Sequence, residues 1–445
     1  ICSAYRVSHI IYIRIPGIMA GLYIHIPFCA SRCIYCGFYS TVPSGGEGKG
    51  KSVEERYVDA MCHEMELRTD EEAASGGETA ELTSIYLGGG TPSQLSFQSL
   101  HRLFHTIETV YHLPFRRDMG TDRRQGCSAA PIEVTMECNP DDVTAEFARR
   151  LRSLPVNRVS MGVQTFSDER LRFLHRRHTA AEAVSAVGRL REAGIGNISV
   201  DLMFGFPGET LEEWEADIAH VLELGAEHIS AYSLMYEEGT PLYRLLQAGK
   251  VREMDDELYR KMYDVLIDRL GSAGYEHYEI SNFARLTPTL SDESPALKVQ
   301  PSNLKFQISN LEVPSPFRSC HNSSYWHDVP YIGIGAAAHS YGNGKRSWNV
   351  ADIRAYIDAI RERRLPCEEE VIDADTHYND TVMTALRTRE GIELSLLSAE
   401  YRSYLMHLAV PFLRKGLLKE DGGRLHLTRK GIYVSDSIMS ELMKV

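Results

Sequence analysis

Short apolar runs alternate with charged, helix-like stretches between Gly21 and about Leu270. The runs are LYIHIPF, TSIYLGGG, IEVTMECNP, RVSMGVQTF, ISVDLMFGFPG and HISAYSLM, and helical sequence such as LEEWEADIAHVLEL follows each of them. Six strand-then-helix units in a row predict a parallel sheet. Several runs end in Gly, Asn, Pro or Gln, so we expect their loops at the carboxyl edge, where such folds carry their chemistry.

Two stretches interrupt this alternation. Residues 115–131 and 286–319 are polar, rich in Ser or Pro and poorly periodic, and we interpret both as surface insertions without a part in function. The pattern divides the chain into a core barrel over 19–272, an α/β extension over 273–372 that contains the second insertion, and a C-terminal unit over 373–445.

The C-terminal unit has the pattern of a helix, a short hairpin and a second helix. It ends in GLLKEDGGRLHLTRKGIYVSDSIMSELM, in which Gly422 and Gly423 mark the turn of the hairpin. This order is typical of a winged-helix module. Winged helices often bind DNA, but this one is not notably basic, so a packing or docking role is favoured.

Composition and charge narrow the class of protein. The chain has 445 residues, of which 43% are hydrophobic and 24% charged, and single cores rarely exceed about 250 to 300 residues. A net charge of −13 argues against a nucleic-acid binder, which needs a basic surface. Six of the nine cysteines are scattered, unlike a secreted disulfide framework, so we expect a reducing, cytoplasmic location.

The apolar N-terminal sequence HIIYIRIPGIMAGLYIHIPF does not predict a membrane span. Arg14, Pro16, His25 and Pro27 interrupt it before the roughly 20 apolar residues that a span requires. It also lacks the separate regions of a signal peptide. The run MAGLYIHIPFC from Met19 is typical of a natural start, so we expect residues 1–18 to be a non-native or disordered extension.

Three cysteines, Cys29, Cys33 and Cys36, form a C-x3-C-x2-C run directly after the first predicted strand. Zinc sites usually take four ligands from two pairs, and the sequence contains no second pair. Three cysteines on a cubane [4Fe–4S] cluster would instead leave one iron open to another ligand. Two alternatives stay open here, namely three buried cysteines at a strand end and an opportunistic zinc site.

A glycine-rich turn, GGGTPS at residues 88–93, ends the second predicted strand. Its glycines expose backbone groups to a ligand. Such turns are common on their own, but this one follows the strand next to the cysteine loop. The two loops are therefore expected at the same edge of the sheet.

The cysteine run, with an aromatic residue before its last cysteine, resembles that of the radical S-adenosylmethionine (SAM) superfamily. Nearly all of residues 20–445 resemble its coproporphyrinogen oxidase-like branch, and most closely the HemW-type heme chaperones. The resemblance is carried by LYIHIPFC, LGGGTPS, EVTMECNPDDV, RVSMGVQTF, VDLMFGFPGET, YSLMYEEGTPLY, YEISNFA, HNSSYW and YIGIGAAAHS. It implies a partial (β/α)6 TIM-type barrel, followed by an α+β region that ends in the winged-helix-like module.

The resemblance also implies which residues hold the cofactors. Cys29, Cys33 and Cys36 would bind the [4Fe–4S] cluster. The residues that would bind SAM are Tyr23, Tyr35, Gly89, Gly90, Thr91, Glu137, Gln164, Arg176 and Asp201. Carboxylates such as Glu137 and Asp201 can accept hydrogen bonds from ribose hydroxyls or an amino group, and a guanidinium can pair with the SAM carboxylate. His175 stands where relatives often have glycine, which bears on the contacts of Arg176.

A bound SAM implies a further partner. In this superfamily one electron from the reduced cluster cleaves SAM to methionine and a 5′-deoxyadenosyl radical. The sequence shows no second iron–sulfur motif and no flavin motif. We therefore expect an external electron donor, a flavodoxin or a ferredoxin.

The residue two positions after the third cysteine separates two branches of the family. Oxygen-independent coproporphyrinogen oxidases resemble this chain but carry a fourth cysteine there, and a longer arm before the first strand. Here that position is Phe38, and the first cysteine comes ten residues after Met19. Both differences favour the chaperone branch.

A second discriminating motif is CHNSSYW, residues 320–326. The pattern H-N-x-x-Y-W resembles that of heme-binding relatives, in which the histidine could give the iron an axial nitrogen and the aromatic residues a flat apolar surface. His321 is thus a candidate heme ligand, with a hydrogen-bonded structural role equally open. A Cys320 thiolate could compete for the iron, and His339 is a further candidate.

Three functions therefore remain, in order of preference. The first is a heme chaperone on a radical SAM core, with heme and a heme-accepting apo-protein as partners. The second is a coproporphyrinogen III oxidase, which converts two propionates to vinyl groups with loss of carbon dioxide. The third is a structural iron–sulfur protein. Transient membrane contact during delivery, a homodimer and an enzymatic role for SAM cleavage all stay open at this point.

Overall fold

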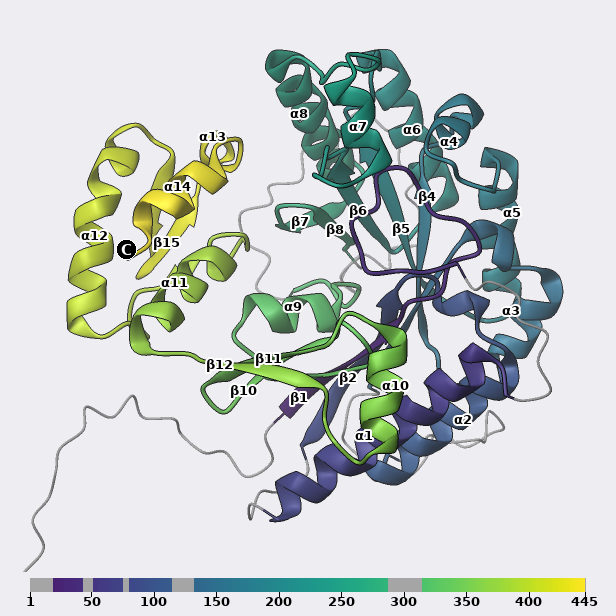
Figure 1. Ribbon diagram of the computed structural model, residues 1–445. Helices are drawn as coiled ribbons and strands as arrows, with labels where there is room; N and C mark the ends of the chain where they lie inside the picture. The colour runs from purple at the N-terminus through teal and green to yellow at the C-terminus, as the bar shows by residue number, and fades with distance from the viewer. Residues whose placement is uncertain (1–18, 43–50, 75–79, 114–131, 287–313, 445) are drawn as a thin grey trace, which may run out of the picture.

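The computed structural model describes residues 19–42, 51–74, 80–113, 132–286 and 314–444. The expectations for residues 1–18, for the insertion at 115–131 and for most of the insertion at 286–319 lie outside this part of the chain. Figure 1 shows one large curved sheet with helices along its outer side, and a smaller C-terminal unit around a second sheet.

The strands and helices have the following bounds. The strands of the large sheet are β1 (Met19–Ile26), β2 (Glu81–Gly89), β3 (Glu133–Cys138), β4 (Arg158–Gln164), β5 (Asn197–Phe204), β6 (His228–Ser233), β7 (Tyr275–Glu279), β8 (Asn282–Arg285), β9 (Tyr331–Ile334), β10 (His339–Gly342), β11 (Lys345–Asn349) and β12 (Cys367–Val371). The small sheet contains β13 (Ile392–Glu393), β14 (Leu418–Asp421) and β15 (Arg424–Leu427). The helices are α1 (Val53–Ala74), α2 (Phe97–Val110), α3 (Ala145–Leu151), α4 (Asp168–Phe173), α5 (Ala180–Glu192), α6 (Leu211–Leu224), α7 (Pro241–Gln247), α8 (Asp256–Ser272), α9 (Cys320–Trp326), α10 (Ile353–Arg361), α11 (Ala374–Ala385), α12 (Ala399–Arg414), α13 (Arg429–Ile432) and α14 (Ser435–Leu442). None of these helices combines the length and the apolarity that crossing a membrane requires.

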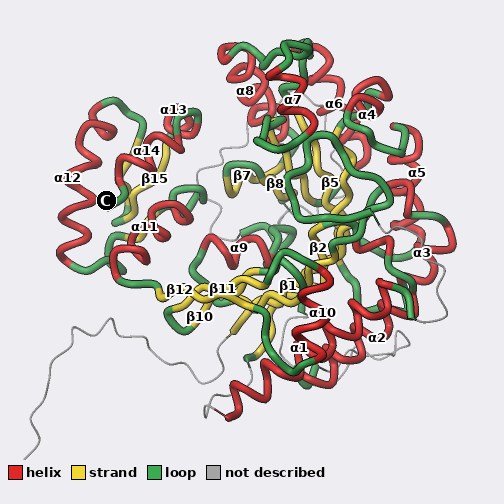
Figure 2. The backbone as a smooth tube through the Cα atoms, in the orientation of Figure 1, coloured by secondary structure: helices red, strands yellow, loops and turns green. Residues whose placement is uncertain are grey.

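The six predicted runs form β1 to β6, which are parallel neighbours in chain order. Figure 2 shows these strands inside a surround of helices. Strand β9 extends the sheet beyond β1, while β8 and β7 extend it beyond β6, and the two edge strands β12 and β7 do not pair with each other. The sheet is therefore an open, partial barrel, which confirms the predicted fold class.

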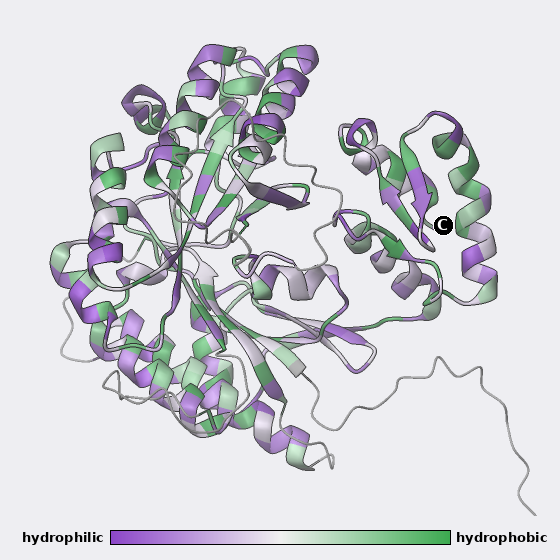
Figure 3. Ribbon diagram, turned by 180° about the vertical axis from the view of Figure 1, so that it is seen from behind, coloured by the Kyte–Doolittle hydropathy of each residue, from purple (hydrophilic) through white to green (hydrophobic). Residues whose placement is uncertain are grey.

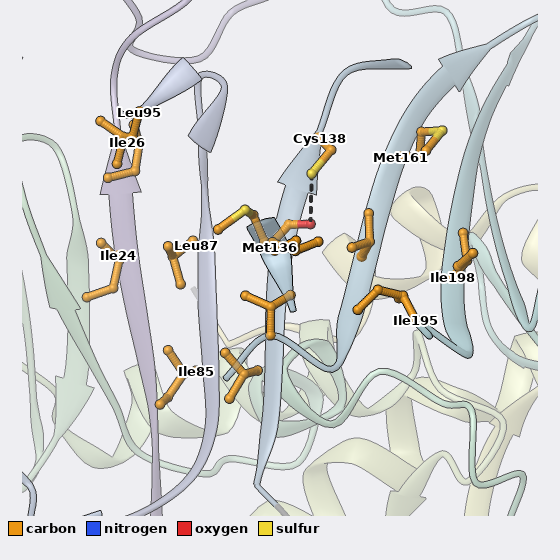
Figure 4. Packing of buried hydrophobic residues seen from close by; sticks show 14 of the residues in the cluster. Ile24, Ile26, Ile85, Leu87, Leu95, Met136, Cys138, Met161, Ile195 and Ile198 are labelled. Carbon is orange, nitrogen blue, oxygen red and sulfur yellow. Dashed lines mark hydrogen bonds between the residues drawn. The ribbon is translucent and has the colours of Figure 1, made fainter. Parts of the chain in front are cut away.

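The outer face of the barrel sheet is apolar. Leu22, Ile24 and Ile26 of β1 are fully buried and share one core with the helices outside the sheet. Figure 4 shows further members of this core on β2 to β5, among them Ile85 and Met161. In Figure 3 the central strands carry mainly apolar residues, whereas the outer helices alternate apolar and polar residues, as expected of helices with one buried face.

The inner face of the same strands is polar. The intervening residues that line the barrel interior include Tyr86, Glu137, Arg158, Ser160 and Asp201. In closed barrels of eight strands this space is filled by branched apolar side chains. Burial of polar groups costs free energy unless they find partners, so this interior is suited to a polar ligand.

Helix α9, which carries the HNSSYW motif, is anchored beside the barrel. The Glu133 carboxylate accepts hydrogen bonds from the backbone N–H groups of Cys320 and His321, at 3.1 Å each. The Ser319 hydroxyl accepts one from the N–H of Asn322 at 3.2 Å. Ser315 and Ser319 are buried, so the last residues of the stretch predicted as a surface insertion instead belong to the packed structure.

The C-terminal unit has the predicted winged-helix-like order. Its hairpin of β14 and β15 turns at Gly422 and Gly423, whose φ angles of 57° and 77° lie in the left-handed region that favours glycine. A hydrophobic core of its own, including Leu405, Leu425 and Ile438, holds the helices against the small sheet. The unit therefore packs around its own core.

Candidate cofactor site

A cavity of about 370 Å³ opens at the carboxyl edge of the barrel sheet. It is lined by residues that the sequence assigned to the cluster or to SAM, namely Cys29, Cys33, Tyr35, Cys36, Gly89, Gly90, Thr91, Glu137, Gln164, Arg176 and Asp201. The other two predicted residues, Tyr23 and His321, do not line it. Residues of five neighbouring strands and of the loops after them thus converge on one place.

The three cysteines lie on the loop that follows β1, here called the cluster loop (residues 27–42). The loop is closed at its base, because Cys29 N–H donates to the Thr41 carbonyl at 2.9 Å and Thr41 N–H to the Pro27 carbonyl at 2.6 Å. Among the described residues, no three His, Cys, Asp or Glu side chains lie close enough together to hold one metal ion. Zinc sites usually take four ligands, whereas on a cubane cluster three cysteines each bind a different iron.

The glycine turn lies directly against the cluster loop. Gly90 N–H donates to the Ile26 carbonyl at 2.7 Å, and Thr91 N–H donates to the Phe28 carbonyl at 2.8 Å. A Cβ atom on Gly90 would lie 2.8 Å from the Ile26 oxygen, 2.9 Å from the Phe28 oxygen and 3.1 Å from the Cys29 Sγ. Only glycine allows this approach, so the turn helps to fix the position of the cysteines.

We expect Gly90→Ala to lower both the stability and the cluster content of the protein. The added methyl group meets two backbone oxygens below 3.0 Å, and such overpacking costs about 1–3 kcal/mol. Urea unfolding and iron analysis after reconstitution measure the two effects. Gly188→Ala is the matched control, because Gly188 is exposed in α5 with nothing within 4 Å of the added Cβ. Equal cluster content in wild type and Gly90→Ala would contradict this account.

Two carboxyl groups form the polar floor of the cavity. The Glu137 carboxylate accepts hydrogen bonds from the Tyr86 hydroxyl at 2.8 Å and the Gly89 N–H at 3.1 Å. The Ser160 hydroxyl donates to Asp201 at 3.3 Å. Burial raises the pKa of Glu137 to about 7 and that of Asp201 to about 6. The oxygens of both groups can accept hydrogen bonds from the hydroxyl or amino groups of a bound ligand.

Arg176 extends across the cavity beside the cysteines. Its Nη2 donates to the Asn139 Oδ1 at 2.7 Å and to the Gly162 carbonyl, and its Nη1 lies 3.6 Å from the Cys33 Sγ. Its Nε is buried without a hydrogen-bond partner. An unsatisfied buried donor is costly, and a ligand carboxylate at this point would satisfy it. The arginine therefore fits the SAM carboxylate, as the resemblance implied.

Two residues of the site have a left-handed backbone although they are not glycine. His175 has a φ of 61° and Gln164 a φ of 72°, and the pairing of β4 with β5 shifts register between Gly162 and Gln164. The glycine of relatives at the position of His175 would adopt such an angle freely. The histidine nevertheless leaves Arg176 with its contacts, and backbone strain of this kind is typical of functional sites.

Tyr23 lies below the cavity wall. Its hydroxyl is 3.0 Å from the His25 Nδ1, and its ring stacks against Tyr86 and His321 with centroid distances of 6.3 and 6.2 Å. The residue stands three positions before the end of β1, and each strand residue advances about 3.3 Å. Tyr23 thus contacts Tyr86, a residue of the cavity wall, and its role as a SAM ligand stays a prediction.

His321 is buried at the start of α9. Its Nδ1 lies 2.9 Å from the Ser84 hydroxyl and its Nε2 lies 2.9 Å from the Tyr325 hydroxyl. Burial lowers the pKa of the ring to about 3. In this conformation both ring nitrogens have hydroxyl partners, which is compatible with the structural role that the sequence left open. The role of His321 as a heme ligand stays a prediction. The neighbouring candidates Cys320 and His339 are exposed.

The cavity also contains residues that the sequence reasoning did not identify. Asn139 links two predicted residues, since it accepts from Arg176 and donates to the Thr91 hydroxyl at 3.3 Å. The position of Asn139 directly after the third predicted strand could have identified it from the sequence. Arg158 is 2% exposed at the cavity floor and lies 3.9 Å from Glu133. The only sequence feature that could have identified Arg158 was its charge at the start of an apolar run.

Comparison with known proteins agrees with the fold. Residues 23–221 match the Radical SAM superfamily, and residues 372–434 match the HemN C-terminal domain. The chain is 31% identical to the heme chaperone HemW of Bacillus subtilis over 430 residues, which cover 96% of this chain and 99% of the relative. It is 29% identical to the heme chaperone HemW of Mycobacterium tuberculosis, with 96% of each chain covered.

A solved structure has the same architecture. Coproporphyrinogen III oxidase (HemN) from Escherichia coli superposes with a TM-score of 0.73 at 20% identity, over 97% of this chain and 92% of that one. At this level of identity the likeness concerns the fold. The similarity to the relatives, in contrast, extends through the barrel, α9 and the C-terminal unit. The chain therefore belongs to the radical SAM superfamily and, within it, to the HemW family.

Proposed function

We propose that the protein is a heme chaperone, which binds heme and transfers it to acceptor apo-proteins. The observation that carries this proposal is the near full-length similarity to relatives named heme chaperones. Phe38 supports it, because this side chain is 70% exposed at the mouth of the cluster cavity. The fourth cysteine of the decarboxylase pattern would occupy that place.

The radical SAM family implies a [4Fe–4S] cluster and SAM as cofactors. In this proposal Cys29, Cys33 and Cys36 hold the cluster, and Arg176, Glu137 and the other cavity residues bind and orient SAM. A reduced cluster supplies the electron that cleaves SAM when both are bound. The electron donor is an external flavodoxin or ferredoxin, since the chain shows no second redox motif.

The second candidate function is the coproporphyrinogen III oxidase reaction. The superposition with coproporphyrinogen III oxidase favours it at the level of the fold. Phe38 argues against it, because the exposed phenyl ring cannot act as a thiol does. The location we propose is the cytoplasm, with transient membrane contact and a homodimer as further elements of delivery to be tested.

One anaerobic preparation separates the candidate functions. The protein is reconstituted with iron and sulfide, and one sample is tested for SAM cleavage with dithionite, for heme binding by titration, and for carbon dioxide release from coproporphyrinogen III. We expect heme binding and SAM cleavage without carbon dioxide. Turnover of coproporphyrinogen would establish the oxidase instead, and absence of both SAM cleavage and heme binding would leave a structural iron–sulfur protein.

A further inference from the structure

A second cavity, of about 530 Å³, lies behind the cluster loop and between α4 and α7. In Figure 1 both helices lie at the top of the barrel, next to the purple cluster loop. The second cavity is lined by apolar residues, by three cations and by one histidine. The apolar residues include Ile34, Phe173 and Leu245, the cations are Arg172, Arg244 and Lys250, and the histidine is His175. His175 also lines the cluster cavity, so the two cavities share this residue.

The apolar floor of the second cavity is the reverse side of the cluster loop. Ile34 stands between Cys33 and Cys36, is buried, and packs in one small core with Leu174 and Leu242. Its N–H donates to the Leu174 carbonyl at 3.2 Å, and its carbonyl accepts from the Leu242 N–H at 2.9 Å. A ligand on this floor would therefore contact the segment that carries the cluster cysteines.

The rim of the cavity is cationic. Arg172, Arg244 and Lys250 are exposed, and no carboxyl group is among the residues that line the cavity. Within the described ranges, none of these three cations forms an ion pair with a carboxylate, whereas the neighbouring Arg170 and Arg177 are both paired. In a chain of net charge −13, a rim of unpaired cations around an apolar floor is complementary to a ligand with anionic groups and an apolar body.

His175 provides a nitrogen ligand at the edge of this cavity. Its side chain is exposed between the two cavities, and its φ of 61° is one that glycine adopts without cost. A non-glycine residue with this backbone angle is strained. A neutral imidazole is a common ligand of heme iron.

We propose that the second cavity binds heme, with His175 as an axial ligand of the iron. The macrocycle would lie on the apolar floor, and the arginines and the lysine would pair with its two propionates. This proposal rests on the proposed chaperone function and names the place where the cargo binds. It differs from the assignment of His321, whose two ring nitrogens are both occupied by hydroxyl groups.

The test compares heme titrations of the full-length wild type and His175→Gly. We expect the variant to bind heme about tenfold or more weakly and to lose the absorption and electron-paramagnetic-resonance signature of an imidazole ligand. Metal-free protoporphyrin IX, which cannot form the iron–nitrogen bond, should bind both proteins alike. The double variant R244Q/K250Q should weaken the binding of heme and of protoporphyrin IX together.

The matched control is His112→Gly. His112 is also an exposed histidine with a left-handed backbone, at a φ of 54°, but it follows α2 and lines neither cavity. Both variants relieve the same kind of strain, and melting curves verify that both are folded. Unchanged heme affinity and spectrum in His175→Gly would overturn the inference while leaving the chaperone function intact. A wild type that binds no heme would instead refute the proposed function itself.

Discussion

Replacing Cys33 with alanine is expected to leave a protein that no longer holds a [4Fe–4S] cluster. The loop offers three thiols to a cluster of four irons, so the loss of one leaves two irons without a protein ligand. Loss of the outer partners of metal ligands already costs about 10–100-fold in affinity, and loss of a ligand should cost more. Iron and sulfide analysis after anaerobic reconstitution measures the loss, and SAM cleavage with dithionite should fall to background.

Cys367→Ser is the control for this experiment. Cys367 is half-buried on the edge strand β12 and does not line the cluster cavity, so the variant should reconstitute as the wild type does. Normal iron and sulfide in Cys33→Ala would contradict the assignment of this thiol. If the wild type contained one zinc ion per chain and no sulfide, the three cysteines would belong to a zinc site.

The strands of the barrel could be predicted from the sequence because their signal is local. Each run is short, apolar and bounded by glycine, proline or polar residues, and these features act within a few residues of the chain. The polar interior was harder to see. Residues such as Ser160 and Asp201 alternate with larger apolar neighbours, and only the assembled barrel shows that they share one face.

Apart from Asp201, the predicted site residues that line the cavity stand close to or after the carboxyl ends of strands. That position alone brings them together, because parallel strands end at one edge. Asp201 and Arg158 show where this reasoning stops. Asp201 stands three residues before the end of β5 and Arg158 starts β4, yet both line the cavity. Depth inside a barrel depends on strand stagger and side-chain length, which a linear pattern does not contain.

His321 and His175 illustrate the same limit for a single side chain. A motif can indicate a histidine, but whether its nitrogens are free depends on partners such as Ser84, which is 237 residues away in the chain. The left-handed backbone of His175 follows from its place after α4, where the relatives' glycine was the only hint. Neither feature can be calculated from local sequence.

Glu137→Gln is expected to stabilise the protein in neutral to alkaline solution while weakening SAM binding. Burial raises the pKa of Glu137 from 4.5 to about 7. The folded state therefore holds a proton between these pH values that the unfolded state has lost, and the stability gained from this site disappears as the pH rises through 7. Above pH 7 the buried charge costs about 3 kcal/mol. A neutral amide avoids that cost, accepts from the Gly89 N–H and donates to the Tyr86 oxygen.

Unfolding by urea at pH 5 and pH 8 and SAM titration of the reconstituted protein measure the two effects separately. Glu209→Gln is the matched control, since burial also raises the pKa of Glu209 to about 7, while its carboxylate accepts from Gly205 and Phe206 outside the cavity. It should share the gain in stability at pH 8 and leave the SAM affinity unchanged. If Glu137→Gln binds SAM as the wild type does, Glu137 is not a SAM ligand. If Glu137→Gln changes the free energy of unfolding equally at both pH values, the Glu137 carboxyl group does not titrate near neutrality. The destabilisation that this group causes in the folded state then does not come from its charge.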